Sequence, residues 1–382
     1  MLSAPMAKRL LGAAAATAAA AALCYLNARR RRTREAAAVA AALQGPIPEG
    51  AVALATFQYA RRAWWRALPP FDYSVTTVAA LADGADATLD GNGAALARFA
   101  ALDDEAVDAT DAETCATVLF PAAERLLVET TGCARAVCFD HIARAAVGAT
   151  VDLGGRDAKR LGPIRASGAS GPINIVHNDY SIASGRPRIR SLLRPFVADP
   201  GALEAVLAGR CSIVNVWCPL GDVRSDPLAF VDWPSLRPRD LRVRRVAYDT
   251  GRVGETTGVY DSATHAWRYF PGMARGTAML LKTWDSRPGP GEEPRSLYAA
   301  HASAALAGVD AAATPRRSVE MRCLLLYDAA AAADDFFARP FVAPHIARVR
   351  SGASFYEKVL RVTYFDEDPD AWVPPEARAF TS

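Results

Sequence analysis

The tripeptide His177-Asn178-Asp179 carries residue types that bind a transition metal. It lies in the run Ile173 to Tyr180, whose apolar residues favour a β-strand, and strand residues two apart point to the same face. His177 and Asp179 would then supply two ligands of a two-histidine, one-carboxylate triad. Such a triad holds non-haem Fe(II) and leaves coordination positions open. A His-x-Asp pair alone also fits an ordinary surface hydrogen bond, so a second histidine and a co-substrate anchor are needed.

The five histidines of the chain leave few candidates for the third ligand. His141 and His345 lie before and after the region expected to form a β-barrel. His265 stands where a turn enters a strand, a position that favours a hydrogen-bonded structural role. His301 stands among small residues that would let a metal and a co-substrate approach. We therefore expect His301 to complete the triad.

A candidate anchor lies in the segment Pro315 to Arg322, which runs into an apolar strand. Strand alternation places Arg316, Ser318, Glu320 and Arg322 on one face. A guanidinium followed two residues later by a hydroxyl suits a terminal carboxylate, because the guanidinium offers a forked pair of donors. Arg322 also fits a salt-bridge ladder with Glu320 on an edge strand.

The charge of the 382-residue chain is unevenly distributed. Residues 1–34 contain seven basic residues and no acid, a formal charge of +7. The whole chain carries +3, so residues 35–382 carry −4. No basic face is required, and nucleic acid is not an expected partner. Seven cysteines without CxxC spacing indicate reduced thiols in a reducing compartment.

The composition of residues 1–34 predicts a membrane anchor or a targeting peptide that lies outside the folded domain. Residues 10–26 form an uncharged, alanine-rich stretch just short of the ~20 residues that span a bilayer. Arg29 to Arg32 follow, which would leave a membrane-anchored catalytic domain in the cytoplasm. A cleaved organelle-targeting peptide, also arginine-rich and free of acids, is an equal alternative. Residues 35–50 are interpreted as a helical linker and 51–382 as a single domain.

The body of the chain predicts helices followed by many short strands. A helix is expected from about Asp111 to Thr131, where apolar residues recur at helical spacing. Past His177, short apolar segments separated by Pro and Gly turns are typical of a sandwich or small barrel. Strands are expected at 213–217, 228–231, 242–248, 267–270, 278–284 and 319–327, with helix and loop after residue 329.

The order of the candidate residues narrows the fold class. His-x-Asp, a long gap, His and then Arg-x-Ser is the order of an Fe(II)/2-oxoglutarate oxygenase on a double-stranded β-helix. We therefore expect a mainly β fold with flanking helices. Its jelly-roll or cupin-like core should cover about residues 135–330, between helical N- and C-terminal flanks.

Longer motifs resemble the fungal and bacterial hydroxylase/desaturase family that includes gibberellin GA4 desaturase and the cephamycin 7α-methoxylation component. The matching motifs run in the family's order from about residue 55 to 330. They are Cys138-Phe139-Asp140-His141 with Arg144, His177-Asn178-Asp179, Asn215 to Leu220 with Pro227-Leu228-Ala229, His265-Ala266-Trp267, Lys282 to Ser286, and His301 with Pro315 to Arg322.

The resemblance implies hydroxylation or desaturation of a small-molecule secondary metabolite with O2. It implies Fe(II) on His177, Asp179 and His301, and 2-oxoglutarate as the second cofactor. The residues expected to bind 2-oxoglutarate are Arg316, Ser318 and Arg322, and those expected to bind substrate are Asn215, Trp217, Cys218 and Lys282.

Cys218 stands where the family has an arginine. If Cys218 lines the pocket, the substrate should be less acidic or bulkier than the family's carboxylic acids, because a thiol offers no counter-charge. The alternative is that position 218 lies outside the pocket and that the cysteine fills a gap.

Two other classes of function stay open at this point. One is a non-catalytic or non-oxidative β-helix protein with a vestigial metal site. The other is a membrane-tethered binding module, which a closed or metal-free pocket would favour. No GxSxG, P-loop or HExxH pattern supports a hydrolase, an NTPase or a zinc protease.

Overall fold

The computed structural model describes residues 53–60, 71–81, 87–145, 171–289, 291–306, 309, 315–352 and 359–366. The expected membrane or targeting segment 1–34 and the expected linker 35–50 lie outside these ranges. In the part of the chain that is described, no helix is both long enough and apolar enough to cross a bilayer.

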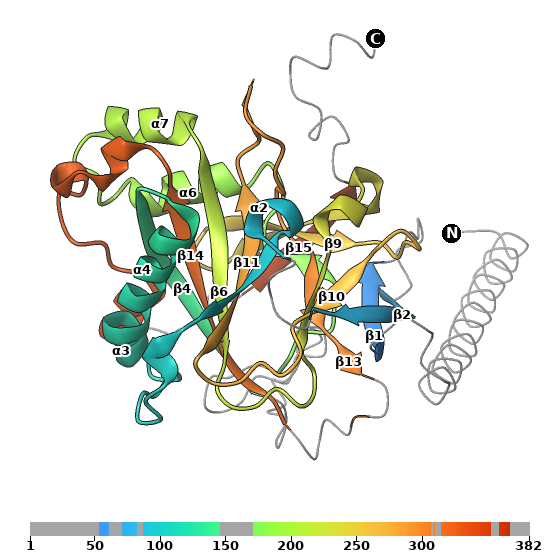
Figure 1. Ribbon diagram of the computed structural model, residues 1–382. Coiled ribbons are helices and arrows are strands. Elements are labelled where there is room, and N and C mark those ends of the chain that lie inside the picture. The colour runs from blue at the N-terminus through green and yellow to red at the C-terminus, as the bar shows by residue number, and fades with distance from the viewer. Residues whose placement is uncertain are drawn as a thin grey trace, which may run out of the picture.

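Two β-sheets form the centre of the fold (Figure 1). The strands of the larger sheet are Ala53–Ala60 (β1), Phe71–Ala80 (β2), His177–Asn178 (β5), Leu228–Val231 (β7), Leu241–Tyr248 (β8), Val253–Val259 (β9), Trp267–Tyr269 (β10), His301–Ser303 (β12), Ala305–Leu306 (β13) and Val359–Asp366 (β15). Those of the smaller sheet are Ala94–Arg98 (β3), Arg135–Ala145 (β4), Cys211–Pro219 (β6), Thr277–Asp285 (β11) and Arg317–Leu326 (β14).

The pairing of these strands is antiparallel except between β2 and β10. The larger sheet has the order β13-β1-β2-β10-β7-β12-β5-β9-β8-β15, and the smaller has the order β3-β11-β6-β14-β4. Neighbouring strands such as β14 and β4 are far apart in the sequence, so long-range pairing sets the shape of the site.

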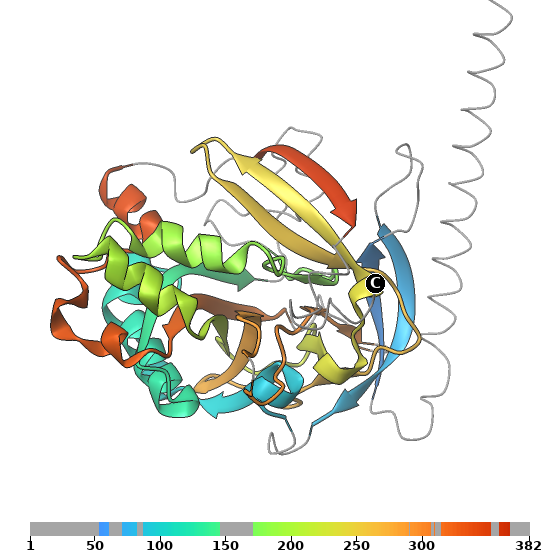
Figure 2. The same ribbon diagram turned by 90° about the horizontal axis from the view of Figure 1, so that it is seen from above.

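The helices lie mainly on the side of the smaller sheet, as Figures 1 and 2 show. They are Leu89–Asn92 (α2), Ala112–Thr114 (α3), Phe120–Thr131 (α4), Gly185–Leu193 (α6), Pro200–Ala208 (α7) and Pro344–Arg350 (α8). A π-helical turn, Cys115–Leu119, joins α3 to α4. The helix expected from Asp111 to Thr131 is therefore confirmed. Pro121 lies in the first turn of α4, directly after the π-helical turn, and the helical run continues through it.

The smaller sheet is buried on both faces. Trp217 of β6 lies in one apolar cluster with Phe230 of β7, between the two sheets. The next residue, Cys218, belongs to a second cluster with Leu127 of α4 and Ile346 of α8. Successive strand residues point to opposite faces, so Trp217 and Cys218 face different layers. Only the layer between the sheets contains the candidate metal ligands.

The expected fold class, mainly β with a jelly-roll core, is confirmed. The expected limits of the core at about 135 and 330 were too narrow, because β1, β2, β3 and β15 extend the sheets on both sides. The flanks are therefore not purely helical. The sequence of β3, Ala-Ala-Leu-Ala-Arg, has high helical propensity, and only pairing with β11 makes it a strand.

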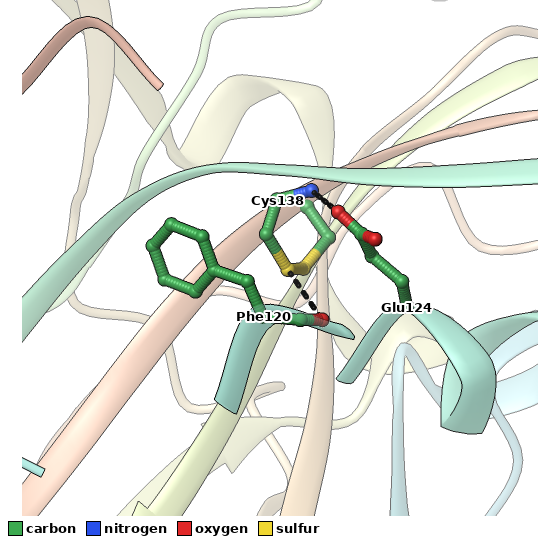
Figure 3. The surroundings of a disulfide bond; sticks show 4 residues. Phe120, Glu124 and Cys138 are labelled. Carbon is green, nitrogen blue, oxygen red and sulfur yellow. Dashed lines mark hydrogen bonds between the residues drawn. A yellow bond between two sulfur atoms is a disulfide. The ribbon is translucent and has the colours of Figure 1, made fainter. Parts of the chain in front are cut away.

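A disulfide joins Cys138 of β4 to Cys323 of β14 (Figure 3). Both cysteines are buried, and the backbone N–H of Cys138 donates to the carboxylate of Glu124 on α4. The expectation of reduced thiols is therefore wrong for this pair. The two cysteines are 185 positions apart in the sequence, and no local pattern indicated that their strands pair. The other described cysteines are free and buried: Cys115, Cys133, Cys211 and Cys218.

Candidate metal centre and its surroundings

Strand pairing in the larger sheet brings two histidines together. His177 of β5 lies directly opposite His301 of β12 in the antiparallel register. Their ring centroids are 4.5 Å apart. The ligand atoms of these histidines and of Asp179 all lie within 4.8 Å of one another. Within the described residues, this is the one group of three His, Cys, Asp or Glu side chains that could hold a metal ion.

The strand that carries the first two ligands is shorter than the sequence indicates. β5 contains only His177 and Asn178, and Asp179 follows in a bend. The buried Asn178 amide donates to the carbonyl oxygens of Tyr180 and Thr283, at 2.6 and 2.9 Å, and these bonds draw the chain out of the ladder. The Asp179 carboxylate still reaches His177, with Oδ1 3.6 Å from Nε2.

Each histidine is oriented by a carbonyl of its own chain segment. Nδ1 of His177 is 2.7 Å from the carbonyl oxygen of Ile175, and Nδ1 of His301 is 3.0 Å from that of Ala299. A carbonyl only accepts hydrogen bonds, so Nδ1 carries a proton in each ring, and Nε2 is the nitrogen that the neutral imidazole offers to a metal. Burial, together with His301, lowers the pKa of His177 to about 3, so His177 is neutral at neutral pH.

The carboxylate of Asp179 is held from the smaller sheet. Its Oδ2 accepts from the Asn215 amide at 2.9 Å and from Nε of Arg322 at 3.1 Å. Burial alone would raise the pKa of Asp179, but the Arg322 guanidinium, the two histidines and Asn215 hold it well below its usual range. The carboxylate is therefore ionised, with Oδ1 directed toward His177. Such partners fix the orientation of a metal ligand.

Arg322 lines the larger cavity described below, but its guanidinium is fully engaged by three carboxylates. Besides Asp179, it donates from Nη1 to Asp140 at 3.0 Å and from Nη2 to Glu320 at 2.8 Å. Burial would lower the pKa of Arg322, but these carboxylates hold it well above its usual value. This corrects the expectation that Arg322 binds 2-oxoglutarate, because each of its nitrogens already has a carboxylate partner. The salt bridge with Glu320 that the sequence also allowed is present.

A buried histidine pair lies behind Asp140. His345 of α8 has Nδ1 3.4 Å from the Asp140 carboxylate and Nε2 2.8 Å from Nδ1 of His141. Burial lowers the pKa of both histidines, to about 4 for His141, so both are neutral at neutral pH. This pair supports Asp140, which in turn holds Arg322 behind the metal ligand.

Arg316 is buried beside the metal ligands, and Ser318, two residues further along the chain, is buried as well. Arg316 lines a cavity of about 20 Å³ together with His301 and Trp217. Its Nη1 donates to the carbonyl of Asp226, and its guanidinium lies 5.2 Å from the centre of the Trp217 ring. Burial lowers the pKa of Arg316 to about 10, so the side chain is charged at neutral pH.

Two donors at this place lack a hydrogen-bond partner among the described residues. They are Nε of Arg316 and Oγ of Ser318, and both atoms are buried. Buried polar atoms without a partner are rare in native proteins and costly. A ligand carboxylate would satisfy a guanidinium and a hydroxyl together. These donors fit the end of a dicarboxylate co-substrate, and the adjacent imidazole and carboxylate ligands fit Fe(II).

The four residues expected to contact substrate are not brought together. Asn215 binds Asp179, and Trp217 lines the small cavity. Cys218 faces the helical layer, so the missing arginine at its position says nothing about the substrate. Lys282 points to α2, where its Nζ lies 2.6 Å from the Asp90 carboxylate. Neither Cys218 nor Lys282 lines the cavities beside the histidines.

A larger cavity of about 1070 Å³ opens beside His177 and Asp179. Its walls come from β4, α6 and the hairpin of β8 and β9. Sequence reasoning did not assign any residue of α6 or of this hairpin to the site. The available signal was the clustering of arginines near 186–190 and 242–245, which is also typical of solvated surfaces.

Known proteins share this sequence pattern and fold. Residues 70–326, about two thirds of the chain, match the family described as "Oxidoreductase/YMDC permease-like domain". Aspirochlorine biosynthesis protein N of Aspergillus oryzae is 31% identical over 131 residues, which cover 34% of this chain and 53% of that protein. The alpha-ketoglutarate-dependent dioxygenase tstK of Talaromyces stipitatus is 26% identical over 225 residues, which cover 58% of this chain and 73% of that protein.

A solved structure extends the likeness to three dimensions. The iron and alpha-ketoglutarate-dependent endoperoxidase NvfI superposes with a TM-score of 0.55 at 19% identity, covering 72% of this chain and 97% of that chain. At this identity the likeness shows a shared fold. The chain spans about half the length of the Aspergillus protein that it matches.

Removing the amide of Asn215 should weaken metal binding without unfolding the protein. In Asn215→Ala the Asp179 carboxylate keeps only Arg322 to orient it, and loss of such a partner costs about 10–100-fold in metal affinity. Anaerobic titration with Fe(II) measures the effect. Ser212→Ala is the matched control, because Ser212 is a buried polar residue of β6 whose hydroxyl faces Tyr327. Equal metal affinity of the two folded variants would contradict this role of Asn215.

Proposed function

Because the chain belongs to the oxidoreductase/YMDC permease-like domain family, we propose that its metal centre is that of a non-haem Fe(II)- and 2-oxoglutarate-dependent dioxygenase. The observation that carries this proposal is the convergence of His177, Asp179 and His301 to within 4.8 Å. The relatives named above include an alpha-ketoglutarate-dependent dioxygenase, which supports the same cofactors.

In this function, His177, Asp179 and His301 hold Fe(II), and Arg316 with Ser318 holds the distal carboxylate of 2-oxoglutarate. The bound iron and co-substrate use O2 to supply the oxidising power for attack on an unreactive C–H bond.

The chain's own residues bind, orient and shield these groups. The carbonyls of Ile175 and Ala299 orient the two rings through Nδ1 so that Nε2 is the atom available to a metal, and Asn215 holds the other oxygen of the Asp179 carboxylate. The indole of Trp217 lines the small cavity and gives it an apolar wall.

The reaction we propose is hydroxylation or desaturation of a small secondary metabolite. Its support is the motif order of the sequence and the biosynthetic relatives. A narrower kinship to gibberellin GA4 desaturase and the cephamycin 7α-methoxylation component rests on the sequence motifs alone.

The two other classes of function are less well supported. A vestigial metal site does not account for the two unpaired donors at Arg316 and Ser318, which sit beside three ligands with their supporting hydrogen bonds in place. A binding module with a closed pocket does not fit a cavity of about 1070 Å³ that reaches His177.

Removal of either of two ligands should abolish the iron chemistry. Asp179→Ala or His301→Ala leaves only two of the three ligands, so the 2-oxoglutarate-dependent visible absorption band and succinate formation should both be lost. Anaerobic spectroscopy followed by succinate analysis measures these effects. Asp222→Ala is the control, because this exposed carboxylate pairs only with Arg224 on the surface. Full retention of the band in either ligand variant would falsify the triad.

Arg316→Ala should weaken 2-oxoglutarate binding while leaving iron in place. Loss of a charged hydrogen-bonding contact costs about 1.5–3 kcal/mol, or roughly ten- to a hundredfold in affinity. The KM for 2-oxoglutarate should rise by this factor, whereas Arg317→Ala, which removes the neighbouring exposed arginine, should leave it unchanged. If Arg322→Ala raises the KM more than Arg316→Ala at equal iron content, Arg322 rather than Arg316 binds the distal carboxylate of 2-oxoglutarate.

We also propose, from the sequence alone, that residues 1–34 determine where the protein resides. Two forms of the proposal are an anchor through residues 10–26 with a cytoplasmic catalytic domain, and a cleaved organelle-targeting peptide. A chain that begins at Glu35 should stay in solution and bind Fe(II) as the full chain does, because residues 1–34 contain no His, Asp or Glu. Aggregation of the shortened chain, or loss of its iron, would show that the segment packs into the domain.

A further inference from the structure

The large cavity beside the metal ligands has an excess of positive charge on its walls. Among the described residues, seven arginines and three carboxylates line it. The wall therefore carries four more cationic than anionic side chains before any metal is bound. A concave surface of one sign of charge focuses the field inside it.

All three lining carboxylates are already used by two of the arginines. Asp140 and Asp179 pair with Arg322. Glu255 pairs with Arg245, whose Nη2 is 2.7 Å away. Arg322 and Arg245 thus take up all three carboxylates that line the cavity. Five lining arginines remain.

Two of those five, Arg188 and Arg244, form no ion pair with any residue in the described ranges. Arg188 lies on α6, with its guanidinium 5.6 Å from the centre of the Phe139 ring. Arg244 lies on β8, in the opposite wall element. Both side chains are only partly exposed. A guanidinium presents forked donors that match carboxylate, phosphate or sulfonate oxygens, so these two offer an oxyanion site.

The rest of the cavity suits an apolar molecule. Phe139, Ile142 and Tyr180 line the same cavity as the arginines and the metal ligands. The volume of about 1070 Å³ is at the upper end of pockets that bind drug-sized molecules. A ligand held by its anionic end would reach the metal ligands with its apolar body.

We propose that the substrate is a bulky organic anion whose oxyanion group is bound by Arg188 and Arg244. This inference rests on the proposed function and specifies the substrate class of the same site. It replaces the expectation of a less acidic substrate, which depended on Cys218 lining the pocket.

A pair of fluorescent probes with the same aromatic body tests the proposal. 1-Anilinonaphthalene-8-sulfonate carries an anionic group, and N-phenyl-1-naphthylamine lacks it. Both are titrated against the full chain loaded anaerobically with Fe(II) and 2-oxoglutarate. The sulfonate should bind at least about tenfold more tightly than the neutral probe, because a charged hydrogen bond is worth about that factor.

Variants then assign the preference to the two arginines. Arg188→Gln and Arg244→Gln should each remove most of the preference for the anionic probe while leaving the neutral probe unchanged. Arg190→Gln is the control, because Arg190 lies on the same helix but pairs with Glu204 outside the cavity. Ala183→Trp, which adds bulk at a lining position, should weaken both probes and so locate them in the cavity.

Displacement of the sulfonate by 1-naphthoate or by 1-naphthyl phosphate decides which oxyanion binds better, and a preference for either supports the proposal. Equal binding of the anionic and neutral probes, or an unchanged preference in both arginine variants, would overturn it. The 2-oxoglutarate absorption band is recorded in every sample. Its absence from the wild-type protein would refute the proposed function, whereas an intact band without anion preference would refute only the substrate class.

Discussion

The buried guanidinium of Arg322 is the interaction on which the candidate site depends. It joins carboxylates from three elements: Asp179 after β5, Asp140 on β4 and Glu320 on β14. One guanidinium thus serves three carboxyl groups, in a place largely shielded from water. Breaking a buried pair of this kind costs about 3–5 kcal/mol, because it leaves an uncompensated charge inside the protein.

This network also shows why both sheets are needed. The larger sheet carries the metal ligands, with His177 on β5 and His301 on β12. The smaller sheet carries the groups that hold or complement them, with Asn215 on β6 and Arg322 on β14. The two sheets therefore have to close on each other before the site exists. The disulfide between Cys138 and Cys323, close along β4 and β14 to Asp140 and Arg322, fixes the pairing of these strands.

The sequence was sufficient to predict the residues whose chemistry is unusual. His177, Asp179 and His301 are scarce residue types in a recognisable order, and the structure brings them together. It was not sufficient to predict which face of a strand points toward the metal ligands. Alternation shows that Trp217 and Cys218 point opposite ways, but which of them faces the metal depends on how β6 packs between β14 and β11. The contact of Arg322 with Asp179 and Asp140 depends likewise on pairing between distant segments.

One element was missed although its sequence carries a strand signal. β15, Val359–Asp366, is rich in β-branched and aromatic residues, which favour strands, and it pairs with β8 more than a hundred residues away in the sequence. The arginines of the cavity were missed for a different reason. Arg188 and Arg244 look like surface charges in the sequence and acquire a common role only when α6 and β8 face one cavity.

The metal ligands and the walls of the large cavity lie on different elements, and this has an evolutionary consequence. The metal ligands and the residues that support them lie on or next to paired strands. A shift of one residue in such a strand turns every side chain to the other face, so an insertion there would turn the ligands away from the site. The helix α6 and the β8–β9 hairpin supply no ligand to the metal. Descendants of one gene can therefore exchange these walls, residue by residue, while they inherit the metal ligands and their supports unchanged.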